Sequence, residues 1–351
     1  MHAALTVEAP RATQTDGRSV VTTLVGGRPL WFSSADAALD PTVEAVACAL
    51  VVAAARHEQR LTSTTAVSPL WLGHHERRAL VLRRWWGLEA LRPVMPVAAV
   101  DGQRPHARTA LCFSGGADSL HVLRASGRRV DDVVLVHGYD VALQATTLAA
   151  RVERSVRAVA AASGAEVIVV RTNLREHPVF DSIDWGWAHG GALAAVGHLL
   201  TGRIGRLLVA ASFPHDDDSP WGSHWRLDPL WSSERLEVAH VGAELWRSEK
   251  LRELAFDPVA QRHLRVCWQA DPGPTGNCGH CEKCVRTMLV LAQCGGLADF
   301  PVFPLDGPLA RRVSALPAIG GHIAPVYVRL LSGGLSEETA VEVRALLERS
   351  A

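Results

Sequence analysis

Between residues 106 and 305, short apolar runs rich in β-branched residues alternate with segments of helical pattern. The apolar runs lie at residues 109–113, 132–136, 166–170 and 206–211, and the helical stretches lie at 118–125, 143–162 and 188–200. This alternation predicts an α/β fold whose parallel sheet is covered on both faces. Because ligands of such sheets bind beyond the carboxyl ends of the strands, we expect a site near residues 114–119, 137–140, 172–175 and 212–218.

The segments on either side follow different patterns, so three domains are predicted: 1–105, 106–305 and 306–351. The first reads as an α+β extension, with a hairpin around Gly26 and Gly27. A helix over 41–56 has Asp40 as its expected N-cap, another runs over 68–86, and a strand at 93–100 precedes a linker at 101–108. The last domain is a tail with a helix over 337–348 capped by Ser336.

The charged residues exclude one large class of phosphate-binding enzyme. Lys and Arg together number 36, and just two of them are lysines, Lys250 and Lys283. Both follow a glutamate, so the chain has no Gly-Lys-Ser/Thr phosphate loop of the Walker type. The formal net charge is zero, which argues against binding nucleic acid by broad phosphate neutralisation.

Two further patterns bear on location. The N-terminal residues lack the basic and apolar regions of a signal peptide. The longest apolar run, residues 45–55, is too short to cross a bilayer. We therefore expect a cytoplasmic protein that binds no membrane, in which the seven cysteines are reduced, reactive or bound to metal.

The sharpest motif is Ser114-Gly115-Gly116-Ala-Asp118-Ser119, directly after the first predicted strand. The glycines allow a tight turn that points backbone N–H groups at an anion, and the helix that follows adds its positive dipole end. A bare phosphate would repel Asp118, so its expected role is to hold Mg²⁺ against the phosphates. The loop thus reads as a polyphosphate and Mg²⁺ cradle without a lysine.

This motif resembles the SGGxDS loop of the N-type ATP pyrophosphatases, the PP-loop family of adenine nucleotide α-hydrolase-like proteins. The resemblance implies a Rossmann-like HUP domain that binds ATP, adenylylates a substrate oxygen and releases pyrophosphate. It assigns Ser114, Gly115, Gly116, Asp118 and Ser119 to ATP, with Asp118 and Ser119 also in catalysis.

Cys267-x10-Cys278-x2-Cys281-x2-Cys284 is the second strong motif. Four thiolates at this spacing suit a tetrahedral Zn²⁺ ion, with Gly279 allowing the bend between them. The same spacing also suits an iron–sulfur cluster, and free cysteines are a further possibility. With no open ligand position evident, a structural zinc is the favoured interpretation.

The cysteine pattern resembles the C-terminal zinc knuckle of the 7-cyano-7-deazaguanine synthases within the same family. The resemblance covers roughly residues 109–290 and leaves out residues 1–105 and the tail after 305. These additions favour a synthase-like PP-loop protein over that synthase itself.

The resemblance implies an ATP-dependent ligase or synthase. A substrate carboxylate or amide oxygen would be adenylylated, and a nitrogen nucleophile such as ammonia would then displace AMP. It also implies a small-molecule substrate and, because related enzymes often dimerise, a homodimer as one option. Nucleic acid is not an expected partner, although tRNA is left open. Two alternatives remain: sulfur transfer to a tRNA or small molecule, which needs a reactive cysteine such as Cys112 or Cys294, and nucleotide binding without turnover.

Polar residues after the second and third strands are candidate ligand contacts. The resemblance places adenine and ribose near the second strand, which makes His137 and Asp140 candidates for the nucleotide. Arg175, beside Asn173 after the third strand, is suited to an anionic substrate because guanidinium pairs with carboxylate bidentately. For all four residues the alternative is a role in capping a turn or loop.

The segment from Trp221 to Glu234 combines three tryptophans with polar groups. Such a mixture suits a pocket for a flat or apolar substrate, with the polar groups fixing its orientation. Its candidate substrate-binding residues are Trp221, Ser223, His224, Asp228 and Glu234. The alternative is aromatic packing beneath a long loop.

Lys250 lies in a Ser-Glu-Lys segment that resembles the lysine-bearing helix start of related pyrophosphatases. There the lysine balances phosphate charge, so Lys250 is a candidate catalytic residue. An ordinary surface lysine is the alternative.

Overall fold

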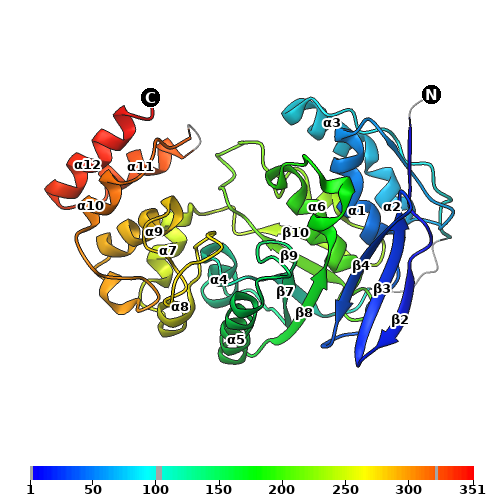
Figure 1. The fold of residues 1–351 in the computed structure, drawn as a ribbon, viewed down its shortest axis with the longest axis horizontal. Helices are drawn as coiled ribbons and strands as arrows, with labels where there is room; N and C mark the ends of the chain where they lie inside the picture. The colour runs from blue at the N-terminus through cyan, green and yellow to red at the C-terminus, as the bar shows by residue number, and fades with distance from the viewer. Residues whose placement is uncertain (1–2, 100–104, 321–322) are drawn as a thin grey trace. The chain divides into compact units, whose positions relative to one another are not determined.

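The computed structural model describes residues 3–99, 105–320 and 323–351 (Figure 1). These form two compact units, each assembled from separate stretches of the chain. The first comprises residues 1–114 and 128–244, and the second comprises 115–127 and 245–351. This division differs from the three consecutive regions expected from the sequence.

The first unit is built on one eight-stranded sheet, with the order β10-β9-β6-β7-β8-β4-β3-β2 (Figure 1). Five neighbouring strands are parallel: β6 (Thr109–Cys112), β7 (Asp132–His137), β8 (Glu166–Thr172), β9 (Arg206–Ala210) and β10 (Glu237–Val241). Numbered along the chain, these five strands lie in the order 5-4-1-2-3. From β6 the chain adds β7 and β8 on one side, and then β9 and β10 on the other side of β6. The carboxyl ends of β6 and β9 therefore form the topological switch point of the sheet.

The parallel strands form because they bury side chains on both faces. All six residues of β7 are buried, which explains its unbroken apolar run. The predicted strands at 109–113, 132–136, 166–170 and 206–211 are all confirmed, within two residues at each end. The mixed α/β class is therefore confirmed, with a sheet that is parallel in part.

The N-terminal hairpin joins this sheet instead of standing apart. The antiparallel strands are β2 (Arg11–Thr15), β3 (Arg18–Val25) and β4 (Arg28–Ser34). Phe32–Ser34 of β4 pairs antiparallel with Val170–Thr172 of β8, so the hairpin extends the sheet at that edge. A separate short sheet pairs β1 (Ala4–Thr6) with β5 (Arg60–Thr62).

Two helices of the first unit pack closely against each other. They are α1 (Val43–Arg56), in which 12 residues are buried, and α6 (Trp185–His198). A Cβ at Gly191 of α6 would lie 2.4 Å from the carbonyl oxygen of Cys48 in α1, so the glycine permits this contact. α5 (Thr146–Ser163) links β7 to β8, as predicted.

Three predictions for the N-terminal region differ from the structure: the cap of the first helix, the single helix over 68–86 and the strand over 93–100. The cap of α1 is Thr42, while Asp40 accepts hydrogen bonds from Thr201 and Gly202. The expected helix over 68–86 is two helices, α2 (Pro69–Gly73) and α3 (His75–Trp86), with a break at His74.

The expected strand at 93–100 is also wrong over its described part. Val94 and Val97 form isolated bridges and no continuous strand. The linker expected at 101–108 lies largely outside the described residues.

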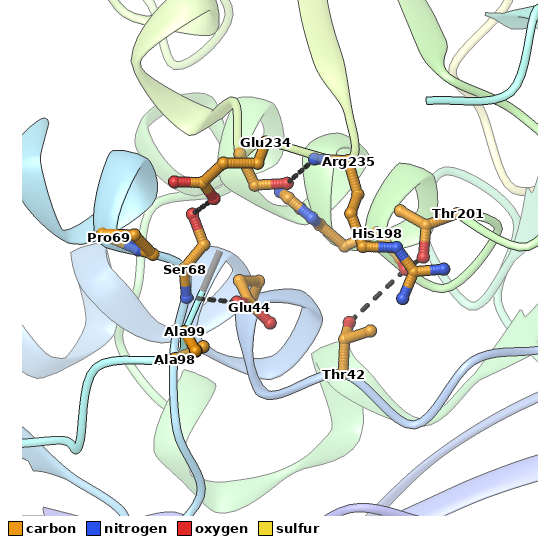
Figure 2. Close-up of a pocket in the computed structure, with 11 residues that line it drawn as sticks. Thr42, Glu44, Ser68, Pro69, Ala98, Ala99, His198, Thr201, Glu234 and Arg235 are labelled. Carbon is orange, nitrogen blue, oxygen red and sulfur yellow. Dashed lines mark hydrogen bonds between the residues drawn. The ribbon is translucent and has the colours of Figure 1, made fainter. Parts of the chain in front are cut away.

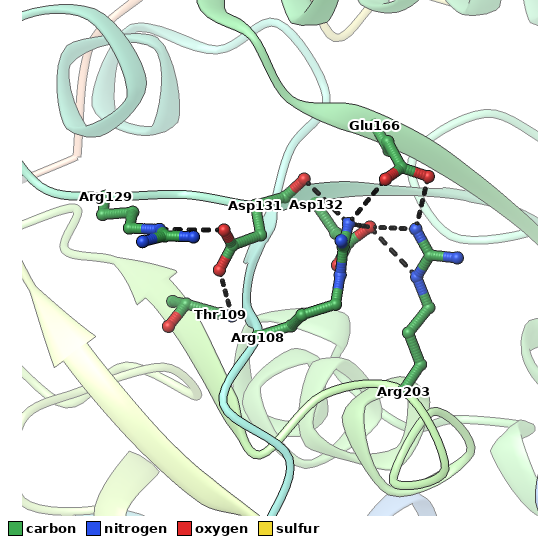
Figure 3. A network of polar contacts seen from close by, with 7 residues as sticks. All are labelled: Arg108, Thr109, Arg129, Asp131, Asp132, Glu166 and Arg203. Atoms are coloured by element: carbon green, nitrogen blue, oxygen red, sulfur yellow. Dashed lines mark hydrogen bonds and ion pairs between the residues drawn. The ribbon is translucent and has the colours of Figure 1, made fainter.

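An ion network holds the start of the parallel strands (Figure 3). The carboxylate of Asp132, which is fully buried, pairs with Arg108 at 2.8 Å and with Arg203 at 2.6 Å. Both arginines also reach Glu166 at the start of β8. The network thus ties the first residues of β7 and β8 to the segments that lead into β6 and β9.

The second unit is helical in its described residues. Its helices are α4 (Ala117–Arg124), α7 (Arg247–Leu254), α8 (Pro258–His263), α9 (Glu282–Gln293), α10 (Leu309–Ser314), α11 (Ala324–Leu331) and α12 (Glu337–Glu348). Side-chain contacts connect α4 to later segments: His121 Nε2 lies 2.7 Å from the Glu253 carboxylate, and Arg124 forms an ion pair with Asp257 at 2.9 Å. The predicted helix over 337–348 and its cap, Ser336, are confirmed. No helix in the described parts of either unit has the length and hydropathy of a membrane span.

Candidate functional site

The glycine loop begins where β6 ends. Ser114 is the last residue of the first unit, and Gly115 opens the second with a φ of +84°, a conformation that suits glycine. Its carbonyl accepts a hydrogen bond from the backbone N–H of Arg265 at 2.9 Å. Gly116 is the N-cap of α4, so the turn leads directly into the N-terminus of that helix.

Asp118 and Ser119 occupy the first turn of α4. The Ser119 hydroxyl donates to the carbonyl of Gly116 at 3.2 Å, which stiffens the turn. The Asp118 carboxylate accepts a hydrogen bond from the Nε of Arg247 at 3.0 Å and lies 3.5 Å from the Nζ of Lys250. The structure therefore brings together two of the predicted catalytic residues, Asp118 and Lys250, around an arginine that sequence analysis did not single out.

The start of α7 presents both cations to α4. The backbone N–H of Trp246 donates to the Glu249 carboxylate at 2.6 Å, which fixes the first turn of α7. Lys250 follows in that turn, and its side chain is 0% exposed. The alternative of an ordinary surface lysine is therefore excluded by the burial of this side chain.

The charges in this cluster shift the pKa of its members. Burial alone would raise the pKa of Asp118, but the charges of Arg247 and Lys250 outweigh it and the pKa lies below its ordinary value. Burial lowers the pKa of Arg247 and Asp118 raises it, with a raised pKa as the net result. One carboxylate thus faces two cations, and the three side chains carry a net positive charge.

A second buried ion pair lies close to this cluster. Arg286 contacts Glu282 of the same helix, α9, with its Nε 3.2 Å from Oε1. Burial lowers the pKa of Arg286, and the Glu282 charge partly offsets that effect. Arg247 and Arg286 were missed in the sequence because the 34 arginines offer no local signal that separates buried from exposed ones.

The four predicted metal ligands converge in the second unit. The sulfurs of Cys267, Cys278, Cys281 and Cys284 all lie within 4.8 Å of one another. The Sγ atoms of Cys267 and Cys281 are 4.0 Å apart, and those of Cys278 and Cys284 are 3.9 Å apart. A tetrahedral zinc with Zn–S bonds of about 2.3 Å requires sulfurs about 3.8 Å apart, so the four residues can hold a metal ion such as zinc.

Side-chain and backbone contacts preform this cluster. The Asn277 Oδ1 accepts from the backbone N–H of Cys267 at 3.1 Å, and its Nδ2 donates to the carbonyls of Leu264 and Val302. At Gly279, with φ of +74°, a Cβ would lie 2.4 Å from the Pro304 ring. The Gly279 carbonyl accepts from Arg312 at 2.9 Å, which holds the bend between the cysteines.

The thiols differ in acidity. The hydrogen bond with Cys284 lowers the pKa of Cys281 to about 5, whereas burial raises the pKa of Cys278 to about 11. Cys281 is also the N-cap of α9, where the helix dipole favours a thiolate. The donor set therefore contains at least one group ready to bind a cation.

In the first unit, three of the four candidates after β7 and β8 contact other protein groups, and Asp140 is exposed. His137 is buried, with Nε2 3.8 Å from Glu153, while Asp140 is exposed. Asn173 accepts from the Trp31 backbone and donates to the Pro29 carbonyl, so it secures β4. Arg175 donates to the Tyr139 carbonyl at 2.6 Å and lies over the Trp185 ring.

Three of the predicted substrate residues, Ser223, His224 and Asp228, form a buried polar network. Asp228 is fully buried and accepts from the Ser223 hydroxyl at 2.7 Å and pairs with His240 at 2.8 Å. Burial, followed by the charge of His240, lowers the pKa of His224 to about 4. The side chains of Ser223 and Asp228 thus bond to each other and brace the loop.

Tryptophans that are only half buried surround this network. Trp86 stacks on Trp187 at 5.5 Å between ring centroids, and Trp85 meets His224 edge-on at 4.8 Å. Trp221 contacts His189 at 5.2 Å. The aromatic character expected of this segment is present, within a cluster that also draws on α3 and α6.

Glu234 lies elsewhere in the first unit. Its carboxylate accepts from the Ser68 hydroxyl and from the Leu70 backbone at 2.8 Å, so it caps α2. It also lines a cavity of about 230 Å³ together with Glu44, His198 and Arg235 (Figure 2). The hydrogen bonds of Glu234 are therefore made to α2 and its cap, and those of the buried network are made to Asp228.

Comparison of the chain with protein-family models, curated proteins and solved structures found no match.

Proposed function

We propose that this chain is an ATP-dependent adenylating enzyme of the PP-loop type. The observation that carries the proposal is the pairing of Asp118 with Arg247 and the buried Lys250 in the first turn after a Gly-Gly bend. A buried lysine is costly unless its charge has a use or a partner, and this one lies at a helix N-terminus that already favours anions. That combination supports phosphate binding.

The topology supports the same proposal. The loop follows β6, one of the two strands at the switch point, and ligands of such sheets bind outside the carboxyl ends there. The strand order 5-4-1-2-3 is the order expected for a Rossmann-like HUP domain.

The residues present fit the phosphates of ATP. Gly115 and Gly116 offer backbone N–H groups without side chains, and Arg247 and Lys250 supply positive charge. Mg²⁺ fits the Asp118 carboxylate when the two cations turn from it toward phosphate oxygens. Bound there, Mg²⁺ would neutralise phosphate charge.

In the proposed reaction, a carboxylate or amide oxygen of a small substrate attacks the α-phosphorus of ATP. The new O–P bond forms as the bond to the β-phosphate oxygen breaks, and pyrophosphate leaves. A nitrogen nucleophile then displaces AMP. In this mechanism Arg247 and Lys250 stabilise the charge that develops on the leaving pyrophosphate, and the rigid turn positions the phosphates.

The cysteine cluster has a structural role in this proposal, with zinc as the favoured metal. A closed set of four thiolates leaves no position for a reacting water. The ion would join the segment at Cys267 to the start of α9, the helix that carries Glu282 and Arg286.

The two lysines of the chain provide a matched test. Titration calorimetry with Mg²⁺ and α,β-methylene-ATP should show Lys250→Gln weakening binding about tenfold or more, because a phosphate contact is lost. Lys283→Gln, at an exposed position, should bind like the wild type. Equal affinity of all three proteins would refute the proposal.

A second measurement tests turnover. Pyrophosphate release should depend on a candidate acid or amide substrate and should fall strongly in Asp118→Asn. Tight ATP binding with no pyrophosphate release on any such substrate would favour a nucleotide-binding protein without turnover.

Sulfur transfer is the less supported alternative. Burial raises the pKa of Cys112 to about 12 and also raises the pKa of Cys294, so neither thiol is activated. The described cysteine with a lowered pKa, Cys281, belongs to the metal-ligand set.

A further inference from the structure

The first unit contains a polar cavity that the proposed adenylation does not use. It measures about 230 Å³ and is lined by residues from five segments of the chain, among them Glu44, Ser68, Ala98, His198, Thr201 and Arg235. That size suits a small metabolite and is below the range of most drug-sized ligands.

The cavity lies at the amino-terminal edge of the parallel strands. Thr201 precedes the start of β9 at Arg206, and Arg235 precedes the start of β10 at Glu237. Ser114, in contrast, follows the carboxyl end of β6, which is parallel to β9. The cavity and the start of the glycine loop are therefore at opposite edges of the sheet.

Charges of opposite sign occupy different sides of the cavity (Figure 2). Glu44 and Glu234 both lie beside Ser68: Glu44 accepts from its backbone N–H at 2.6 Å, and Glu234 accepts from its hydroxyl. The guanidinium of Arg235 points toward Thr201, away from Glu234. Within the described part of the chain it forms no ion pair, so it is available to an anion.

His198 adds an uncharged hydrogen-bonding group to the lining of the cavity. His198 Nε2 lies 2.8 Å from the Trp231 carbonyl, so that nitrogen carries the proton. Burial lowers the pKa of His198, which keeps the ring neutral and leaves Nδ1 as an acceptor. The carboxylates retain unused lone pairs after their bonds to α2, and these are the acceptors that an ammonium group requires.

We propose that this cavity binds a small amino acid as a zwitterion, with the ammonium group toward Glu44 and Glu234 and the carboxylate on Arg235. The pairing is bidentate at the guanidinium, which discriminates a carboxylate from an amide. The proposal is independent of ATP binding and needs no turnover for its test.

The experiment compares ligands that differ by one charge. Thermal shift with the common amino acids on the full chain selects the tightest binder, and calorimetry then compares it with its amide and its N-acetyl derivative. The free amino acid should bind at least about tenfold more tightly than either derivative, because each derivative lacks one ion pair. Equal binding of the three, or no binding of any amino acid at millimolar concentration, overturns the proposal.

Two variants assign the binding to this cavity. Arg235→Gln should lower the affinity for the free amino acid to that for the amide. The affinity for the amide itself should stay unchanged. Ala98→Trp, which fills the cavity without removing a charge, should abolish binding of all three ligands. Arg206→Gln serves as the control for a lost arginine, since Arg206 pairs with Glu237 outside the cavity. Unchanged amino-acid binding in both Arg235→Gln and Ala98→Trp would place the ligand elsewhere and refute the assignment.

Discussion

The ammonium group of Lys250 lies 3.5 Å from the carboxylate of Asp118, and the lysine side chain is completely buried. Arg247 contacts the same carboxylate at 3.0 Å. Two cations on one acid leave the first turn of α4 positively charged, although the whole chain has a net charge of zero. The positive charge that the proposed phosphate binding requires is thus produced locally.

Replacement of Asp118 by Asn should destabilise the protein by about 2–4 kcal/mol, since it leaves two cations without their shared anion in a largely buried site. Urea unfolding measures the loss, with Asp216→Asn in the exposed acidic loop as the control. A change below about 0.5 kcal/mol would show that the cations find other partners.

The same pair predicts a pH dependence of stability. The folded pKa of Asp118 lies below its ordinary value of about 4, so the pair contributes stability above that ordinary pKa. This contribution is lost as the pH falls through the folded pKa. Below pH 4 the free energy of unfolding should therefore decline less steeply in Asp118→Asn than in the wild type. Parallel curves would contradict the lowered pKa.

Metal analysis of the purified protein should find one zinc per chain, and Cys278→Ser should reduce this content. Loss of the ion should lower the melting temperature, because four thiolates hold two segments of the second unit together. Cys294→Ser should retain the full metal content, since Cys294 is outside the cluster. Iron and sulfide in place of zinc would identify a cluster.

The ion network of Figure 3 predicts that removing the charge of Asp132 strongly lowers the stability of the protein. Asp132→Asn leaves Arg108 and Arg203 without their buried partner and should cost about 3 kcal/mol in the free energy of unfolding. Glu237→Gln, which removes an exposed partner of Arg206, should change it by less than about 1 kcal/mol. Similar losses in the two variants would mean that burial does not set the strength of the network.

Gly138→Ala tests the geometry after β7. The residue has φ of +98°, and a Cβ would lie 1.9 Å from the Thr172 carbonyl oxygen, so the variant should fold poorly. Gly127→Ala has a φ of +68° and open space around the Cβ, and should cost only about 1 kcal/mol. Chemical denaturation of both proteins checks the difference, and similar stabilities would contradict the close approach at Gly138.

The parallel strands and the cysteine cluster could be predicted from the sequence because their signals are local. An unbroken apolar run marks β7, and spacing alone brings Cys278, Cys281 and Cys284 together. The pairing of β4 with β8 could not be predicted, since any exposed edge offers the same backbone groups. Residues 221–234 show the same limit: their composition is equally consistent with a pocket and with the buried network around Asp228 that the structure contains.

The partition of the chain into interleaved segments bears on how the protein is made. Asp118 meets Arg247 across 129 residues and Lys250 across 132 residues, while α4 is inserted among segments that belong to the sheet. During translation, the glycine loop emerges long before the cations that neutralise Asp118. Contacts of such long sequence separation form slowly. The glycine loop should therefore acquire its final order only after residues 247–265 have left the ribosome, and a truncated product lacking them would carry Asp118 without its two cations.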